Sequence, residues 1–289
     1  MIFYFSVQGE HMQSNVNMFQ RFLFENLPIR GERVKLTSAW QEILKRREYP
    51  AIVQQYLGEL VATTALLSAT IKIEGRLTVQ IEATGALQML VVQITHDGGF
   101  RATATYRDDL PEHATFKELT EGGRVVITVE NANSNNSYQG VIPLIDESIA
   151  AAIERYFETS EQLRTALFLR NTDNELGGLL LQRIPGEMED EDAFNRICHL
   201  AGTVTAEELN ELDTQTLLYR LYSEDDVRLF DAEPLHFYCQ CSRERSESML
   251  KQLSKEEVDE ILAEDGHLSV TCEFCGKTYD FTADDMQAI

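Results

Sequence analysis

Cys239-Gln240-Cys241 and Cys272-Glu273-Phe274-Cys275 place four of the five cysteines of this chain in two short-spaced pairs near its C-terminus. Thirty residues separate the two pairs. Two such pairs, brought together by a folded hairpin, form a tetrahedral four-thiolate site, which is the geometry that zinc prefers. We therefore expect a zinc-binding unit in which Cys239, Cys241, Cys272 and Cys275 bind one ion.

The first pair has a single intervening residue, which affects what oxidation would do to it. In an extended segment, Cys239 and Cys241 lie on the same face with Cα atoms about 6.6–6.8 Å apart. Both thiolates can reach one zinc ion, whereas a disulfide favours a Cα separation of ~5.5–6 Å. The zinc-bound and oxidised forms therefore need different backbones. The spacing alone leaves three interpretations open: a permanent structural zinc site, a redox switch, or a thiol oxidoreductase that uses Cys272 and Cys275.

Negative charge is concentrated in the C-terminal third of the chain. The formal net charge is −23, and residues 186–289 carry 26 acidic and 8 basic side chains. Binding to nucleic acid or to an anionic membrane requires a basic surface, so both partners are disfavoured. The sequence also lacks the G-x-x-x-x-G-K-[ST] loop that holds nucleotide phosphates, and we expect no ATP binding through such a loop.

The start of the chain is apolar but does not have the pattern of a signal peptide. Met1 to Val7 lacks a basic beginning and a full-length apolar segment. No stretch reaches the ~20 apolar residues of a membrane span. Cysteines at metal-binding spacing fit a reducing compartment better than a disulfide framework. We expect a cytoplasmic protein in which residues 1–17 form an extension of uncertain origin.

Residues 18–185 have the pattern of a single mixed core. A long apolar stretch over 51–69 predicts a buried helix, and 147–157 predicts an amphipathic helix. β-Branched and apolar runs predict strands over 77–81, 87–92, 125–129, 166–170 and 179–184. Strands grouped in runs, with few βαβ alternations, indicate an α+β fold with antiparallel sheets. We further expect a capping box at Ser38 and a turn or bulge at Gly177-Gly178.

Residues 186–233 are predicted to form a helical linker of marginal stability. They follow Pro185-Gly186 and hold 14 acidic and 3 basic side chains. Apolar residues recur on one helical face, and Thr205 opens a second helix with a capping box. The apolar faces favour docking while the net charge opposes compaction, so the helices depend on their neighbours. Cys198 lies on such a face and is expected to be a buried, inert thiol.

Residues 234–289 are too few and too polar to build a large core. Ser254 opens a helix that Gly266 ends. A unit of this size usually needs a metal or disulfides to fold. Arg243, Arg245 and Lys277 lie near the cysteines in sequence. They would either lower thiol pKa values or simply balance the charge of a zinc tetrathiolate.

Several segments together resemble the heat-shock-protein-33 family of redox-regulated chaperonins. The resemblance runs from about Met18 to the end, and Ser246 stands where some members carry an extra cysteine. The segments that carry it, in family order, are Phe22-Leu23-Phe24-Glu25-Asn26, Arg30-Gly31-Glu32, Tyr138-Gln139-Gly140-Val141, Tyr156-Phe157, Ser160-Glu161-Gln162-Leu163, Gly178-Leu179-Leu180-Leu181-Gln182, Cys239-Gln240-Cys241-Ser242-Arg243-Glu244-Arg245, Ile261-Leu262-Ala263-Glu264-Asp265-Gly266 and Cys272-Glu273-Phe274-Cys275-Gly276.

The resemblance implies an ATP-independent holdase rather than an enzyme. Reduced members bind zinc through the four cysteines and are inactive. Oxidation would form the disulfides Cys239–Cys241 and Cys272–Cys275, release zinc and unfold the linker. Exposed apolar surface then captures unfolding clients, and active members form homodimers. The resemblance also implies three units, an α/β core, a helical linker and a zinc domain.

The linker's apolar helix face, together with the core surface that it covers, is the expected client-binding surface. Ordinary core contacts would give the same apolar pattern, so the sequence leaves both interpretations open. The residues of that helix face are Phe194, Ile197, Leu217, Leu218 and Leu221.

Overall fold

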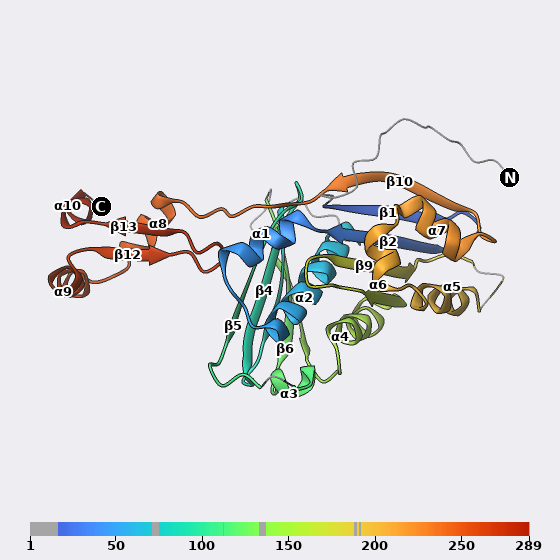
Figure 1. Cartoon of the computed structure of the whole chain (residues 1–289), viewed down its shortest axis with the longest axis horizontal. Coiled ribbons are helices and arrows are strands. Elements are labelled where there is room, and N and C mark those ends of the chain that lie inside the picture. Colours follow the sequence, from blue (N-terminus) through green and yellow to red (C-terminus); the bar gives the residue numbers. More distant parts are fainter. Residues whose placement is uncertain are drawn as a thin grey trace.

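Two β-sheets pack against one buried helix in this computed structural model, which describes residues 17–70, 75–111, 113–132, 137–187, 190 and 192–288. The sheets have the strand orders β10-β1-β2-β9-β8 and β11-β5-β4-β3-β6-β7 (Figure 1). Their neighbouring strands are antiparallel, except that β11 runs parallel to β5. This arrangement confirms the predicted α+β class with antiparallel sheets.

The strands of the first sheet come from three distant parts of the sequence. They are β1 (Met18–Phe24), β2 (Ile29–Leu36), β8 (Thr165–Leu169), β9 (Leu176–Arg183) and β10 (Val227–Pro234). The second sheet consists mainly of consecutive strands, namely β3 (Gly75–Glu82), β4 (Leu87–Thr95), β5 (Gly99–Tyr106), β6 (Arg124–Asn131), β7 (Ser137–Pro143) and β11 (His236–Phe237).

Helix α2, Ala51–Thr70, is the centre of the core. It is apolar on every side, and such a helix is stable only when it is buried all round. It contacts strands of both sheets, and the largest cluster of buried apolar side chains surrounds it. The buried helix predicted over 51–69 is therefore confirmed.

Helix α1, Ser38–Arg46, is capped from outside its own sequence. The expected capping box at Ser38 is wrong: Thr37 occupies the N-cap and makes no side-chain cap bond. Instead, the Asn17 Oδ1 accepts hydrogen bonds from the backbone N–H groups of Thr37 and Ala39, both at 2.9 Å. The Asn17 amide also donates to the Ser38 hydroxyl at 2.7 Å. Residues 1–16 of the expected extension lie outside the described residues.

The remaining helices of the core are short, and the longer of them packs on α2 and on β8 of the first sheet. They are α3 (Phe116–Leu119) and α4 (Ile149–Tyr156), and α4 continues as a π-helical turn over Phe157–Glu161. The amphipathic helix predicted over 147–157 corresponds to α4. Of the helices that the structure describes, none is long and apolar enough to span a bilayer.

Helices α5 (Ala193–Gly202), α6 (Ala206–Glu211) and α7 (Thr214–Tyr222) cover the first sheet (Figure 1). Their apolar faces pack on β1, β2 and β9 and form a second buried cluster. The capping box predicted at Thr205 is present, because the Thr205 hydroxyl accepts from the Glu208 N–H at 3.1 Å and the Glu208 carboxylate accepts from the Thr205 N–H.

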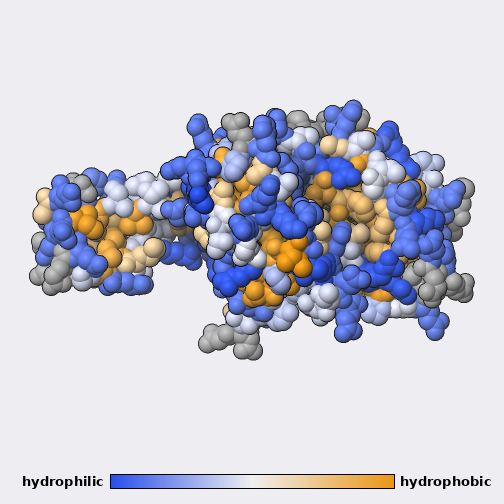
Figure 2. Space-filling view, turned by 90° about the horizontal axis from the view of Figure 1, so that it is seen from below, coloured by the Kyte–Doolittle hydropathy of each residue, from blue (hydrophilic) through white to orange (hydrophobic). Residues whose placement is uncertain are grey.

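The C-terminal elements form a lobe that projects from the rest of the molecule (Figures 1 and 2). They are α8 (Arg243–Leu250), α9 (Lys255–Asp265), β12 (Leu268–Thr271), β13 (Thr278–Phe281) and α10 (Ala283–Ala288). The helix predicted to begin at Ser254 is confirmed; Ser254 forms a capping box with Glu257, and Gly266 ends α9 with a φ of 75°. Only five buried side chains form the apolar cluster described for this lobe.

Candidate metal centre

The second cysteine pair lies in the turn between β12 and β13. The hairpin pairs Thr271 with Thr278, and Cys272 N–H donates to the Lys277 carbonyl at 2.9 Å. The Gly276 N–H donates back to the Cys272 carbonyl at 2.8 Å. Gly276 has a φ of 69°, a left-handed conformation in which other residues are strained. This tight turn brings the thiols of Cys272 and Cys275 to one side of the hairpin.

The first cysteine pair follows directly on an extended segment and precedes a helix. Tyr238 N–H donates to the Phe100 carbonyl of β5 at 2.8 Å, and Cys239 is the next residue. Ser242 begins helix α8 as its N-cap by accepting a hydrogen bond from the Arg245 N–H. The segment that carries Cys239 and Cys241 is therefore fixed to the core on one side and to α8 on the other.

The four sulfur atoms converge on one point. All lie within 4.8 Å of one another, with Cys239 and Cys272 Sγ 3.6 Å apart and Cys241 and Cys275 Sγ 3.3 Å apart. All five cysteines of the chain are free thiols. Zn–S bonds of ~2.3 Å at tetrahedral angles place sulfurs ~3.8 Å apart. The donor set and its spacing therefore fit a zinc ion, and such an ion would keep the four sulfurs deprotonated.

The thiols of this cluster differ in acidity. Burial raises the pKa of Cys272 and of Cys275. Burial acts in the same direction on Cys241, but hydrogen bonds from the Tyr279 hydroxyl and the neighbouring thiols outweigh it and lower the Cys241 pKa to about 7. The Tyr279 hydroxyl donates to the Cys241 sulfur at 3.3 Å. Cys241 therefore has the most acidic of the three shifted thiols.

A positive charge from the core also reaches the cluster. Arg101 of β5 donates to the Cys239 sulfur at 3.7 Å, and its guanidinium lies 4.0 Å from the centre of the Phe274 ring. Gln93 fixes this guanidinium by accepting two hydrogen bonds from it. Arg101 thus links the core to both cysteine pairs and faces the negative charge of a four-thiolate site.

A model of the "Hsp33 protein" family matches residues 17–282. The chain belongs to the Hsp33 family. It is 42% identical over 276 residues to the 33 kDa chaperonin of Nitrosococcus oceani, covering 96% of this chain and 95% of that one. It is 42% identical over 269 residues to the 33 kDa chaperonin of Shewanella sediminis, covering 93% and 94%.

A solved structure has the same fold as this Hsp33 chain. It is the crystal structure of the 33 kDa chaperonin from Thermotoga maritima, with a TM-score of 0.78 and 20% sequence identity. The match covers 94% of this chain and 97% of that one. At this identity the likeness concerns the fold alone.

The basic residues that the sequence placed near the cysteines make their contacts elsewhere. Arg243 donates to the Asp280 carbonyl and stacks on the Phe281 ring, 4.2 Å from its centre. Arg245 donates to the Gln240 carbonyl, and Lys277 lies over the Tyr279 ring. Arg101 and Tyr279 contact sulfur instead, and the sequence reasoning missed both. Tyr279 lies four residues after Cys275 and could have been considered, but nothing local in the sequence points to Arg101.

One extended segment connects this metal centre to both sheets of the Hsp33 fold. We call residues 227–238 the strap; it contains β10 and β11. Strand β10 pairs antiparallel with β1 at the edge of one sheet, and β11 pairs with β5 at the edge of the other. The strap crosses position 233/234, where the sequence placed the end of the linker. A loss of order at Cys239 would therefore affect the strand pairing at both sheet edges.

The expected client-binding residues lie at the interface between the linker helices and the first sheet. Phe194, Ile197, Leu217 and Leu218 are buried there, and Leu221 is half-buried. The core surface beneath them is also apolar and consists of Phe22, Phe24, Ile29, Leu179 and Leu181. These residues are covered while the linker is docked and would become accessible if it left.

A buried arginine holds the linker to the core. Arg33 of β2 is 0% exposed, and its guanidinium donates to the Leu209 and Leu212 carbonyls at 2.5 and 2.6 Å and to the Thr214 hydroxyl at 3.0 Å. All three acceptors belong to α6, α7 or the turn between them. Burial lowers the Arg33 pKa to about 10, so it remains charged at neutral pH. The groups that it contacts on the linker are two carbonyls and a hydroxyl, which carry no net charge. The strength of the interaction therefore depends on how closely these groups approach the guanidinium.

The glycine pair of β9 permits close approach of helix α6, and the prediction of a turn or bulge there is wrong. Gly177 pairs regularly with β2, and Gly178 pairs regularly with both β2 and β8. A Cβ at Gly177 would come within 2.7 Å of the Asn210 Oδ1 and 3.0 Å of the Leu209 Cγ. Gly177 is therefore needed for the packing of α6 on the sheet rather than for chain reversal.

The fifth cysteine lies apart from the metal centre. Cys198 is half-buried in the linker cluster, and burial raises its pKa to about 11. A thiol with so high a pKa is largely protonated and a poor nucleophile. This environment agrees with the expected inert thiol.

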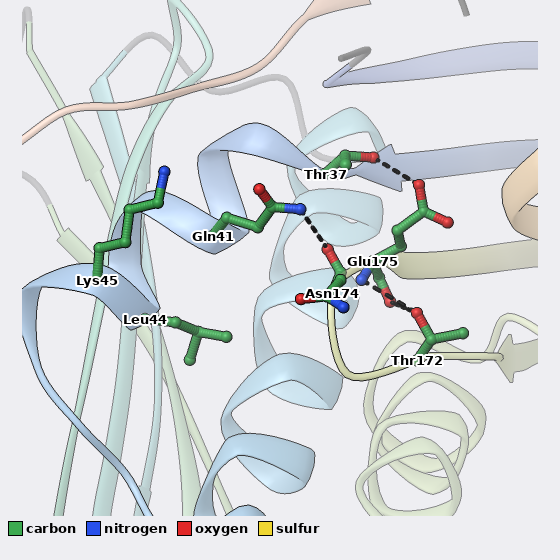
Figure 3. A pocket seen from close by; sticks show the side chains of 7 residues that line it. All are labelled: Thr37, Gln41, Leu44, Lys45, Thr172, Asn174 and Glu175. Atoms are coloured by element: carbon green, nitrogen blue, oxygen red, sulfur yellow. Dashed lines mark hydrogen bonds between the residues drawn. The ribbon is translucent and has the colours of Figure 1, made fainter. Parts of the chain in front are cut away.

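A polar hollow of about 680 Å³ lies between α1 and the turn that joins β8 and β9 (Figure 3). Its lining groups bond to one another: the Thr37 hydroxyl donates to the Glu175 carboxylate at 3.1 Å, and the Gln41 amide reaches the Asn174 carbonyl at 3.5 Å. These pairings leave few polar groups to orient a ligand. The hollow contains no residue of the cysteine cluster or of the linker interface.

Proposed function

We propose that this chain is a redox-regulated, ATP-independent holdase that captures unfolding proteins in the cytoplasm. In this proposal the chain has three units: the core over 18–185, the linker over 186–233 and the zinc-binding switch over 234–289. The observation that carries the proposal is the strap. It ends one residue before Cys239 and joins a cluster of four convergent thiols to the sheet on which the linker helices pack.

The reduced, zinc-bound form is the inactive one. The four thiolates of Cys239, Cys241, Cys272 and Cys275 hold the two segments of the lobe together. Metal binding to units of this kind is worth ~10–16 kcal/mol, far more than the burial of five apolar side chains at ~1.5–3 kcal/mol each can leave after the loss of chain entropy. The ordered lobe keeps the strap on β1 and β5 and thereby keeps the linker surface covered.

Oxidation by a peroxide converts the thiol pairs into the disulfides Cys239–Cys241 and Cys272–Cys275. In each pair, a sulfur–sulfur bond forms as the two thiolates give two electrons to the peroxide. Its two oxygens take up two protons from the solvent and leave as water. The sulfurs are then no longer thiolate donors, so the lobe cannot bind zinc. The Cys239–Cys241 bond also requires a backbone change at the residue that follows the strap.

Loss of the ordered lobe releases the linker. Its segment carries 14 acidic and 3 basic side chains, and this repulsion favours undocking once the strap is free. Undocking exposes two apolar surfaces, that of the linker helices (Phe194, Ile197, Leu217, Leu218 and Leu221) and that of the sheet beneath them. These surfaces bind unfolding clients, and pairing of the same surfaces between two chains favours a homodimer.

The test mixes the reduced and the peroxide-treated chain with a protein that unfolds on heating and follows light scattering. Suppression of aggregation by the oxidised, zinc-free form alone supports the proposal. The control is Cys198→Ser, which leaves the four-thiol cluster intact and retains the switch. The proposal is contradicted if the reduced and oxidised forms suppress aggregation equally, or if neither form suppresses it. Catalytic turnover of a disulfide substrate would indicate an oxidoreductase instead, and zinc retained under peroxide would indicate a static module.

A further inference from the structure

The strap is held at the sheet edges mainly through its main chain. Strand β10 pairs with β1 along its length, although none of its eight side chains is buried. Within the strap, Leu235 alone is buried, at 3% exposure. Backbone bonds continue the pairing at both ends of the strap, from the Glu25 N–H to the Asp226 carbonyl at 2.9 Å and from the His236 N–H to the Gly98 carbonyl at 3.0 Å. The side-chain contacts beside them include the exposed ion pairs Arg21–Glu233 and Arg228–Glu25. The edge therefore places few demands on side-chain identity.

Release of the strap would leave β1 as an edge strand with apolar side chains beside it. Phe22 and Phe24 of β1 face the linker cluster, and Phe19 belongs to the central core cluster. An edge strand presents unpaired N–H and C=O groups and readily pairs with another extended chain. The apolar rings next to it would contact alternate side chains of such a partner. This combination is suited to an extended segment of varied sequence.

Charge also distinguishes the edge from its strap. Strands β1 and β2 carry Arg21, Arg30, Arg33 and Lys35 against one acidic residue, Glu32. The strap is acidic near its middle, and its Glu233 forms an ion pair with Arg21. The exposed edge would therefore favour extended segments that combine apolar and acidic residues and would disfavour basic ones.

From these observations we propose that the β1 edge, once the strap has left, binds an extended segment of the unfolding client as an added strand. The proposal rests on the proposed holdase function and identifies the part of the molecule that receives the client's main chain. Unfolded chains aggregate by pairing their exposed strands with one another. When the β1 edge pairs with such a strand, that strand is no longer available to other unfolded chains. Main-chain pairing also explains how one surface accepts many sequences.

The test uses the oxidised full-length chain and a fluorescent peptide of residues 225–238, which contains the strap and the two residues before it. Two versions are N-methylated, one at residues 226 and 228 and the other at 227 and 229. They carry the same side chains, but in one the methyl groups face the edge and in the other they face solvent. We expect the unmodified peptide to bind the oxidised but not the reduced chain, and to displace a client. One methylated version should bind at least ~10-fold more weakly than the other, or ~1.4 kcal/mol.

Equal affinity of the two methylated peptides, or peptide binding that leaves client binding unchanged, would overturn the added-strand proposal while the holdase function stands. Peptide that dissociates an oxidised dimer without displacing client would assign the edge to a second copy of the chain and also overturn it. If the oxidised chain fails to suppress aggregation without any peptide, the holdase function fails first and the proposal with it. Amide hydrogen exchange gives an independent check: the amides of Phe22–Phe24 should be protected again when client binds.

Discussion

The core and the C-terminal lobe differ in what holds them together. Around α2, apolar side chains of two sheets and several helices form one large buried cluster. The lobe has five buried side chains in its cluster, Leu250, Val258, Leu268, Tyr279 and Phe281, beside four convergent thiols. Apolar burial does not depend on redox conditions, whereas thiolate ligands do. The same chain thus contains a unit that is stable under oxidation and a unit whose stability depends on its thiols.

The linker lies between these extremes. It has an apolar face like the core, but it also contacts the buried Arg33, and the strap pairs with the edge of the sheet on which it packs. In the proposed mechanism, a change in the lobe undocks the linker without unfolding the core.

Replacing the first cysteine pair should have the largest effect. In Cys239→Ser/Cys241→Ser, the loss of two ligands should remove zinc and with it the ~10–16 kcal/mol that metal binding supplies to such a unit. A chromophoric chelator should find no bound zinc, and circular dichroism should show the loss of helices α8 and α9. The melting of the core should persist. Cys198→Ser is the matched control and should retain zinc, and full zinc in the double variant would contradict the ligand assignment.

Removing Arg33 should undock the linker in the reduced protein. Arg33→Ala leaves the Leu209 and Leu212 carbonyls and the Thr214 hydroxyl without their donor, and we expect docking to weaken by about 1–3 kcal/mol for each acceptor that stays buried and unpaired. Hydrogen exchange of α6 and α7 should accelerate while the zinc content stays unchanged.

The matched control for Arg33→Ala is a substitution of Arg220, an arginine of linker helix α7. Arg220 is 55% exposed and forms an ion pair of 3.5 Å with Glu208, so Arg220→Ala should cost at most ~1 kcal/mol. Similar exchange rates in the two variants would show that the buried guanidinium has no special role in docking.

A methyl group at Gly177 should loosen helix α6 by steric overlap. Gly177→Ala places a Cβ 2.7 Å from the Asn210 Oδ1, and overpacking of this kind costs about 1–3 kcal/mol. In Gly202→Ala the nearest atom lies at 3.6 Å, an ordinary contact, so this control should not be destabilised by steric overlap. Denaturant unfolding of both variants measures the difference, and equal midpoints would contradict the close packing of α6.

The pH dependence of the core is the smallest effect when it is expressed per pH unit. Burial raises the Glu32 pKa to about 8, against the attraction of Arg30 and Arg21. The ordinary pKa of this carboxyl group is 4.5. Between pH 4.5 and pH 8, the folded state therefore retains a proton that the unfolded state has lost. The unfolding free energy should therefore fall as pH rises through this window, by at most about 1.4 kcal/mol per pH unit.

Glu32→Gln isolates this contribution. The unfolding free energy of the native chain minus that of Glu32→Gln should decrease between pH 5 and pH 8 and be constant below pH 4. Denaturant titrations at several pH values give this difference. A difference that is constant or rises with pH would show that Glu32 is ionised in the folded protein.

Local sequence patterns were sufficient for the elements whose contacts are local or strongly periodic. They gave helix α2, the apolar face of α5, the capping box at Thr205, the helix that begins at Ser254, and the convergence of the four cysteines. The family resemblance is confirmed as well. The disulfide pairing, the client surface and the boundaries between units are still predictions.

What the sequence did not reveal depends on contacts between distant residues. Strand β10 has no buried side chain and so no alternating pattern, and it exists because β1 offers it an edge. Asn17 caps a helix that begins 21 residues later, and Arg101 reaches Cys239 across 138 positions. The role of Gly177 is visible only once α6 is known to pack against it.

The coupling of thiol chemistry to linker docking is tested most directly by a single peroxide time course. Zinc release, measured with a chelator, and hydrogen exchange of residues 193–222 are followed in the same samples. We predict that α5–α7 lose protection as zinc is released, while the amides of α2 stay protected. Zinc release with a fully protected linker would contradict the account, as would a linker that loses protection while zinc remains bound.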